Sequence, residues 1–530
     1  MSVRTLLIGL DGGTFRVLDS LIGSGVMPFI GSFFAGGVRA PLRSIVPPLT
    51  PPAWTSLMTG RTPGQHGVFD FFRMDSPESR HIRFFTSQDV QCETIWSLAS
   101  RHGLRVTSLN FPAMFPAPRL DGFVVPGWVP WRQLRLACWP EDLFDQLKTI
   151  PSFNPRELAM DIKLEERATE GCSSEKEYEP WIELHIRRER NWLEVLRYLT
   201  LRNPSALTAI LFDGVDKLQH LCWRFLCPED AVPLVSAWEF RVREACLEYF
   251  RALDGILAEL CALAGPDANV LMASDHGFGP TWEVFSVNAW LAEKGYLFWS
   301  ETAAADYLPA ILGVGQVARH TWRIDWSRTR AFTATPTSNG ICIVVNRDGK
   351  SPGISPLEYQ AFRARLIEDL QAVRDPATGS AIVTGIWTRE EAFAGPHQGY
   401  APDLTLGLRD GGLVSILPSP VSLRKRAEIA GTHRPAGMFA ARGPAFRRGA
   451  ALDEMSILDV APAILHVSGL PVPELMQGRV PREAFEPAWL ASCPVAFAVD
   501  ADCHADGLDG AGGDAITGED GQAVLDRLRE

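Results

Sequence analysis

Apolar runs of strand length alternate with longer amphipathic stretches along much of the chain. The strand-like runs cover residues 4–12, 38–47, 104–112, 205–214 and 269–277, and the helix-like stretches between them include 17–37, 93–103 and 235–264. Alternation of this kind is typical of α/β proteins, in which helices cover both faces of a mostly parallel sheet. We therefore predict an α/β fold with a mostly parallel central sheet flanked by helices.

Three of the strand-like runs lead directly into an aspartate. These acids are Asp11, Asp213 and Asp275. Because ligands of parallel sheets bind beyond the carboxyl ends of the strands, we expect the three carboxylates to converge at one edge of the sheet.

Two stretches interrupt the alternation and divide the predicted core. One is a charged helical run, and the other mixes Trp and Pro with a helix-like segment, which indicates insertions on the core. The chain end is acidic and glycine-rich, which is typical of a mobile tail. The predicted parts are a first core part (1–135), a helical insertion (136–200), a second core part (201–290), a cap (291–395), a final core part (396–493) and the tail (494–530).

The composition is that of a large globular protein, with 46% hydrophobic and 22% charged residues in a chain of 530. A net charge of −12 argues against a nucleic-acid polymer as the main partner, because such proteins usually carry a basic surface. The ten cysteines are scattered singly, which favours a reducing compartment. We find neither a secretory signal nor an apolar window long enough to span a membrane, so we predict a cytoplasmic location.

Asp11 and Thr50 are the first candidates for chemistry. Asp11 ends a strand-like run and precedes two glycines, where a carboxylate could bind a metal ion. Thr50 precedes two prolines that place its hydroxyl near a helix N-terminus, whose dipole favours an anion such as phosphate. Ordinary helix capping is the alternative for both residues.

Further carboxylates and imidazoles follow at spacings that suit metal ligands. Asp216 and His220 are four residues apart, on one face of a predicted helix, although surface pairs share this spacing. Asp275 and His276 follow a buried strand and precede a glycine that permits a turn. His433 lies in a glycine-flanked loop, where a lone histidine is usually a surface residue. Its importance depends on the other candidates.

Taken in this order, these segments resemble the alkaline phosphatase superfamily, in particular its type I phosphodiesterase/nucleotide pyrophosphatase branch. The resemblance covers about residues 4–480 and implies an alkaline phosphatase-like core with cap insertions. It implies that Thr50 is the nucleophile, with Pro52 and the pair Thr59–Gly60 matching the family's motif.

The resemblance also implies the metal ligands. One metal would be held by Asp216, His220 and His433, and another by Asp11, Asp275, His276 and the Thr50 oxygen. Mixed imidazole and carboxylate ligands suit Zn²⁺ first, with manganese or iron next. Two such metals would activate the Thr50 oxygen, and the resulting phospho-threonine would be hydrolysed by water.

Two positions depart from the family's pattern. Asp70 and Phe71 stand where related phosphodiesterases carry an Asn that helps to hold the phosphoryl oxygen. That role is therefore unassigned, and Asn110 is the candidate for it. Ala53 stands where nucleotide pyrophosphatases often carry Asn, so nucleotide specificity is not implied. The segment from Thr50 to Trp54 also lacks the Cys or Ser that sulfatases require.

We therefore predict metal-dependent hydrolysis of a small phosphate ester, either a diester or a monoester, through a phospho-threonine. A phosphomutase or phosphotransferase that uses the same intermediate is the alternative. A non-catalytic protein that binds a phosphorylated ligand is a third hypothesis, although a decayed site would be expected to have lost at least one of the seven residues.

Overall fold

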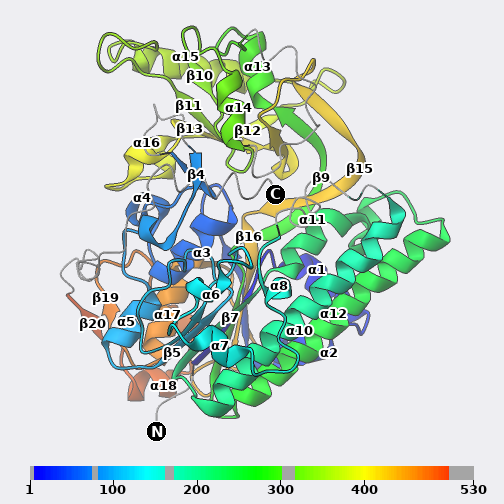
Figure 1. Ribbon diagram of the computed structural model, residues 1–530, viewed down its shortest axis with the longest axis vertical. Helices are drawn as coiled ribbons and strands as arrows, with labels where there is room; N and C mark the ends of the chain where they lie inside the picture. Colours follow the sequence, from blue (N-terminus) through cyan, green and yellow to red (C-terminus); the bar gives the residue numbers. More distant parts are fainter. Residues whose placement is uncertain (1–4, 75–81, 162–171, 173, 301–316, 500–530) are drawn as a thin grey trace.

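The predicted α/β fold with a mostly parallel central sheet is confirmed. The computed structural model describes residues 5–74, 82–161, 172, 174–300 and 317–499 (Figure 1). In this part of the chain the main sheet has nine strands in the order β17–β2–β16–β8–β1–β7–β5–β6, with β18 also pairing with β2. The strands are β1 (Thr5–Leu10), β2 (Val38–Arg43), β5 (Val106–Leu109), β6 (Gly122–Val125), β7 (Leu207–Phe212), β8 (Asn269–Ala273), β16 (Ala436–Arg442), β17 (Ala450–Ala451) and β18 (Met455–Ser456).

The centre of this sheet is buried on both faces. β1 pairs in parallel with β7 on one side and with β8 on the other, and all six of its residues are buried. Leu6 and Ile8 face one hydrophobic cluster, whereas Leu7, between them, faces another. A continuous apolar run is therefore what this strand requires. β16 pairs antiparallel with both β2 and β8, while the other paired strands of the sheet are parallel.

Helices form the two outer layers. The first cluster includes side chains of α1 (Phe15–Gly23), α2 (Pro28–Gly36), α10 (Tyr178–Arg202), α11 (Gly214–Leu226) and α12 (Ala237–Ala264). The second includes side chains of α3 (Thr50–Thr59), α5 (Ile95–Arg101) and α17 (Val460–Val467). The longest helix, α12, begins at a capping box formed by Ser236 and Glu239, a device worth about 1 kcal/mol.

A second, smaller layer of structure, which we call the cap region, lies above the carboxyl edge of the sheet (Figure 1). Two long strands, β9 (Gly277–Ser286) and β15 (Leu423–Arg434), form an antiparallel ribbon that runs from the core to this region, and β14 (Leu413–Ser415) pairs with β9. The region has its own sheet and its own hydrophobic cluster. Its other elements are α13 (Val287–Glu293), α14 (Val317–His320), β10 (Ala331–Phe332), β11 (Gly340–Ile343), α15 (Tyr359–Gln371), β12 (Val383–Thr388), α16 (Arg389–Ala392) and β13 (Leu404–Leu408).

The remaining described elements are short. They are α4 (Pro63–His66), β3 (Phe72–Met74), β4 (Ile82–Phe84), α6 (Leu134–Ala137), α7 (Leu143–Leu147), α8 (Pro155–Leu158), β19 (Val472–Pro473), α18 (Pro487–Ser492) and β20 (Phe497–Ala498). From residue 500 onward the predicted tail lies outside the described residues. Over the described ranges no single helix is long and apolar enough to cross a membrane, although the sharply bent pair α1–α2 reaches that length and composition together. The cytoplasmic location stays a prediction.

Candidate metal centre and nucleophile

The candidate residues gather at the carboxyl edge of the main sheet. Asp11 directly follows β1, and its backbone N–H donates to the carbonyl of Phe212 at the end of β7, 3.0 Å away. Asp275 follows β8 by one residue. Asp213, the third acid at a strand end, forms an ion pair with Lys217 at 2.6 Å. Two of the three acids therefore lie in the centre described below, and the third belongs to a neighbouring buried network.

Asp11, Asp275 and His276 form what we call the inner group. Their ligand atoms lie within 4.8 Å of one another. The Nε2 atom of His276 is 3.2 Å from Asp275 Oδ2 and 3.7 Å from Asp11 Oδ1. All three residues are at most 1% exposed. This part of the centre is therefore fully enclosed by protein.

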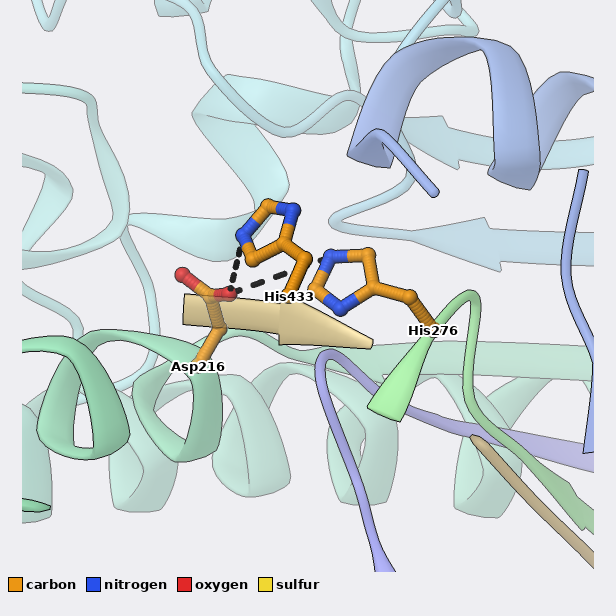
Figure 2. A group of neighbouring side chains, drawn as sticks. All are labelled: Asp216, His276 and His433. Atoms are coloured by element: carbon orange, nitrogen blue, oxygen red, sulfur yellow. Dashed lines mark ion pairs between the residues drawn. The ribbon is translucent and has the colours of Figure 1, made fainter. Parts of the chain in front are cut away.

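Asp216, His220 and His433 form what we call the outer group. Asp216 Oδ1 lies 3.5 Å from His220 Nε2 and 3.3 Å from His433 Nε2, and the two Nε2 atoms are 3.0 Å apart. Figure 2 shows that His276 of the inner group also points toward Asp216, with its Nε2 atom 3.9 Å from Asp216 Oδ1. The two groups are thus contiguous, with His276 between them.

Each of the three imidazoles has a backbone carbonyl beside its Nδ1 atom. The partners are Gly431 for His220 at 3.0 Å, Gly277 for His276 at 3.2 Å and Pro48 for His433 at 2.9 Å. A carbonyl accepts a hydrogen bond from a protonated Nδ1, which leaves the lone pair on Nε2. All three Nε2 atoms are therefore oriented and left without a proton, as metal ligands require.

Thr50 lies beside the inner group, as the first residue of α3. Its Oγ1 atom is 3.1 Å from His276 Nε2, and the residue is 2% exposed. Pro51 and Pro52 have no N–H, and the N–H of Ala53 already donates to the carbonyl of Leu49. These three residues offer no N–H donor to an anion, so α3 contributes its dipole at this position.

The peptide of Gly12 connects the two groups, a role that the sequence did not indicate. The Gly12 N–H donates to Asp275 Oδ1 at 3.0 Å, and its carbonyl accepts from Gln219 Nε2 at 2.8 Å. Gln219 is buried and directly precedes His220. Gly12 has a φ of 65°, and a Cβ there would lie 2.6 Å from the ring of Phe278. This position therefore requires glycine.

Phe278 packs among the imidazoles. Its ring centroid lies 4.8 Å from that of His220, 5.8 Å from that of His276 and 5.3 Å from that of His433. The ring is buried and restricts how far the three histidines can turn. The only sequence signal for this role is its place two residues after His276.

Burial and mutual repulsion disfavour the ionised form of the carboxylates in the inner group. Burial, together with Asp216, raises the pKa of Asp275 to about 7, although the Gly12 N–H opposes the shift. Burial and the carboxylates of Asp275 and Asp216 raise the pKa of Asp11 well above its usual range. Burial lowers the pKa of His276, and the neighbouring His433 lowers it further. A cation would relieve the mutual repulsion of these carboxylates, and the unprotonated imidazole is the form that binds a metal.

In the outer group, the pKa of the carboxylate shifts in the opposite direction. Burial raises the pKa of Asp216, but the imidazoles of His220 and His433 outweigh it and hold the pKa well below its usual range. Burial lowers the pKa of His220, against the Asp216 carboxylate, which raises it. Asp216 is therefore ionised and His220 neutral at neutral pH.

The donor set fits metal ions. Asp11 Oδ1, Asp216 Oδ1 and Asp275 Oδ2 are buried, and none has a hydrogen-bond partner. Buried carboxylate oxygens are normally hydrogen-bonded, so three orphaned oxygens facing three imidazole nitrogens indicate a place for cations. Such a mixed donor set suits zinc, manganese or iron.

The residues considered for the phosphoryl oxygen already have partners. Asp70 accepts hydrogen bonds from Thr335 and Thr337, each at 2.5 Å, and therefore fastens the cap region to the core. Asn110 Nδ2 donates to the carbonyl of Leu211 at 2.9 Å. Trp54 is buried, and its indole N–H donates a hydrogen bond to Asp11 Oδ2, 3.3 Å away.

An α/β sheet that carries carboxylates and imidazoles at its carboxyl edge has the arrangement of a metal-dependent hydrolase. A sequence model described as type I phosphodiesterase/nucleotide pyrophosphatase matches residues 5–434, and the chain therefore belongs to this family. The resemblance predicted from the motifs is confirmed. Membership places the chain among hydrolases of phosphodiester or nucleotide pyrophosphate bonds.

A solved structure has a similar fold. Human ectonucleotide pyrophosphatase/phosphodiesterase 5 is 12% identical and has a TM-score of 0.51, over 91% of this chain and 100% of that chain. The murine protein of the same name is 13% identical, with a TM-score of 0.49 over 91% of this chain and 100% of that chain. A search of curated proteins gives no match.

Proposed function

We propose that this protein hydrolyses a small phosphodiester or phosphomonoester with two divalent metal ions, most favourably Zn²⁺, through a phosphorylated Thr50. One observation carries the proposal. Three orphaned carboxylate oxygens and three imidazole Nε2 atoms converge beside the Thr50 hydroxyl, which lies 3.1 Å from His276 Nε2. When bound, the metals supply positive charge that neutralises the phosphoryl oxygens and holds both sides of an in-line displacement.

The residues of the chain have separate roles as metal ligands and as the nucleophile. Asp11, Asp275 and His276 hold one metal, and Asp216, His220 and His433 hold the other. Thr50 Oγ attacks phosphorus, the bond from phosphorus to the leaving oxygen breaks, the proton of Thr50 passes to the leaving group, and the phosphoryl group stays on Thr50. Water then attacks the same phosphorus, and Thr50 leaves with its proton restored. Burial of the inner group excludes water from the first step.

The test combines metal reconstitution with substitution of the nucleophile. Protein loaded with zinc or manganese is assayed with bis-p-nitrophenyl phosphate, p-nitrophenyl phosphate and a dinucleoside pyrophosphate. Thr50→Ala should lower kcat by at least about 10³-fold with metal content unchanged, since it removes the nucleophile. Thr55→Ala is the matched control, because Thr55 lies in the same helix with its hydroxyl bonded to the carbonyl of Pro51. Equal activity of Thr50→Ala and wild type would exclude the phospho-threonine.

The acceptor of the phosphoryl group is tested separately. Turnover in ¹⁸O-labelled water should place the label in the released phosphate, because water attacks phosphorus in the second step. Products without the label, together with a phosphorylated acceptor, would instead identify a phosphotransferase or phosphomutase that uses the same residues.

A further inference from the structure

The two carboxylate oxygens of Asp11 are in different situations. Asp11 Oδ2 accepts a hydrogen bond from the indole N–H of Trp54 at 3.3 Å. Asp11 Oδ1 has no hydrogen-bond partner and lies 3.7 Å from His276 Nε2. A carboxylate that is held through one oxygen has little freedom to rotate, so the hydrogen bond from Trp54 directs the other oxygen into the inner group.

The indole of Trp54 is itself fixed by the core. The residue is fully buried and belongs to the second hydrophobic cluster. Its ring centroid lies 5.5 Å from that of Phe111, with the two planes at 90°. Gly9 lies in β1, two residues before Asp11, and a Cβ at Gly9 would lie 2.8 Å from the indole ring. Glycine at this position therefore lets the indole pack directly against β1, beside the carboxylate that it supports.

Trp54 lies on the same helix as the proposed nucleophile. Thr50 and Trp54 are four residues apart on α3, which places them one turn apart on one side of the helix. Thr50 Oγ1 lies 3.1 Å from His276 Nε2, and all ten residues of α3 are buried. The helix therefore contacts the inner group at two points. Support of Asp11 from this helix keeps the carboxylate in a fixed position relative to the Thr50 hydroxyl.

The chemistry of the donor suits a carboxylate that must also bind a cation. An indole N–H is a neutral donor without acceptor capacity, so it satisfies one oxygen and leaves the negative charge of Asp11 available. Asp213, which also follows a strand of the sheet, is paired instead with Lys217 at 2.6 Å. A cationic side chain neutralises its carboxylate and competes with a metal ion for it. The two partners therefore agree with the two positions, since Asp11 belongs to the metal centre and Asp213 does not.

We infer that Trp54 is a positioning residue of the inner group, whose indole N–H holds the Asp11 carboxylate in the orientation that binds metal. The inference rests on the proposed function, from which it takes the metal of the inner group. Trp54 acts through Asp11 and takes no part in the bonds that form and break at phosphorus. Groups that hold a metal ligand in this way typically change metal affinity by about 10- to 100-fold.

The test separates the N–H of Trp54 from the packing of its ring. Trp54→Phe removes the N–H and part of the ring, whereas Trp54→benzothienylalanine keeps the bicyclic ring and replaces only the N–H by sulfur. Trp96→Phe is the matched control. Trp96 is also fully buried, and its ring centroid lies 5.4 Å from that of the same Phe111. Its indole N–H donates to Met58 Sδ at 3.2 Å, and not to a metal ligand.

Zinc affinity provides a readout independent of turnover. Chelator competition is measured with each change added to His433→Ala, which reports the inner metal because the outer group has lost a ligand. Both Trp54 variants should raise the Kd for zinc by about 10- to 100-fold, and Trp96→Phe by less than about 3-fold. Urea denaturation should show similar losses of stability in Trp54→Phe and Trp96→Phe, because each removes part of a buried indole.

Turnover gives a second readout. With His433 intact, saturating zinc should return kcat of both Trp54 variants to within about 3-fold of wild type, because the nucleophile and all six metal ligands are retained. Thr50→Ala should stay inactive at the same zinc concentration.

The outcomes separate the two proposals. Unchanged zinc affinity in Trp54→benzothienylalanine would overturn the role of Trp54, because ring packing and not the N–H would then support Asp11. An equal loss of affinity in Trp54→Phe and Trp96→Phe would overturn it as well. If Trp54→Phe does not fold, the benzothienylalanine variant decides alone. A wild type that binds no zinc would refute both proposals, whereas a wild type that binds two zinc ions and cleaves no phosphate ester would refute only the proposed function.

Discussion

The inner and outer groups of the metal centre are built differently. Asp11 and Asp275 sit at strand ends of the central sheet and, with His276, are at most 1% exposed. Asp216, His220 and His433 come from a helix and from the ribbon, and their side chains are 13–17% exposed. One group is fixed by the core, whereas the other is supported by elements that extend toward the cap region.

The difference predicts how each group binds its cation. In the inner group, burial makes the carboxylates weak acids, so protons compete with the metal. In the outer group, Asp216 is already ionised, and affinity depends on how α11 and the ribbon hold the histidines. The far end of the ribbon is tied to the cap region by Arg409 and Lys425, both of which contact Glu283 and Asp375. The ribbon of β9 and β15 therefore supports both the cap region and the outer group.

The largest effect is expected from breaking the inner group. Asp275→Asn removes a ligand and leaves the Gly12 N–H an amide oxygen to bond, so the backbone should hold while the inner metal is lost. We expect kcat to fall by about 10³-fold or more, because the position of the nucleophile depends on that metal. Metal analysis by mass spectrometry should find one equivalent instead of two.

Asp213→Asn is the control for this change. Asp213 also follows a strand of the sheet, but it pairs with Lys217 outside the centre. The variant should keep both metals. Loss of metal from Asp213→Asn, or retention of both by Asp275→Asn, would contradict the assignment of the inner group.

A smaller effect is expected from the outer group. His433→Ala leaves Asp216, His220 and the shared His276 in place, so the outer metal should bind about 10- to 100-fold more weakly. Activity should return when metal is added in excess, which Asp275→Asn should not permit. If no metal concentration restores the activity of His433→Ala, the loss of an outer ligand is as severe as the loss of an inner ligand, and the proposed difference between the two groups is wrong.

The sequence predicted the fold and the members of the site by different routes. Fully buried strands such as β1 appear as apolar runs, and their order along the chain indicates a parallel sheet. The seven candidate residues came from motifs, and the structure brings them together. The rule that acids at strand ends converge on one site fails for Asp213. This residue pairs with Lys217, four residues later, and that spacing was a local signal for an ion pair.

The supports of the site could not be predicted from the sequence. Gln219 bonds to the carbonyl of Gly12, which is 207 residues away in the chain. In the sequence, Phe278 is an ordinary strand residue. Only the structure shows that three imidazoles surround it. Such roles depend on the register of α11 and β9 against β1, which is set by tertiary packing.

The pH dependence of metal affinity should separate the two groups by about tenfold. Asp275 must lose its proton to bind metal, and its pKa is about 7 in the unliganded protein. Below pH 7 the inner affinity should fall by at least about tenfold per pH unit, because Asp11, whose pKa is also raised, must be ionised as well. The outer affinity should change less between pH 6 and 8, because Asp216 stays ionised and burial lowers the pKa of His220.

Chelator competition at pH 6, 7 and 8 measures this dependence. His433→Ala reports the inner metal, and Asp275→Asn reports the outer metal. Parallel pH profiles for the two variants would show that the electrostatic contrast between the groups does not govern binding.

The smallest effect on turnover is expected from the support of α11. Glu189 accepts hydrogen bonds from the N–H of Gly214, at the start of this helix, and from Tyr249, each at 3.0 Å. Burial, followed by the Asp213 carboxylate, raises the pKa of Glu189 from 4.5 to about 8. Between these values the folded state keeps a proton that the unfolded state has lost. Stability should therefore be highest at low pH in this window and fall as pH rises toward 8, by up to about 1.4 kcal/mol per unit.

Glu189→Gln tests this contribution, because its amide oxygen can accept both hydrogen bonds and has no proton to lose. Urea denaturation at pH 5.5, 6.5 and 7.5 should give a flatter stability profile for the variant than for wild type, with kcat changed by less than about 3-fold. Glu183→Gln makes the same change on an exposed position of α10 and should leave the wild-type slope intact. If Glu189→Gln has the same slope of stability against pH as wild type, Glu189 is ionised in the folded protein. The start of α11 is then held by a charged carboxylate and not by a protonated one.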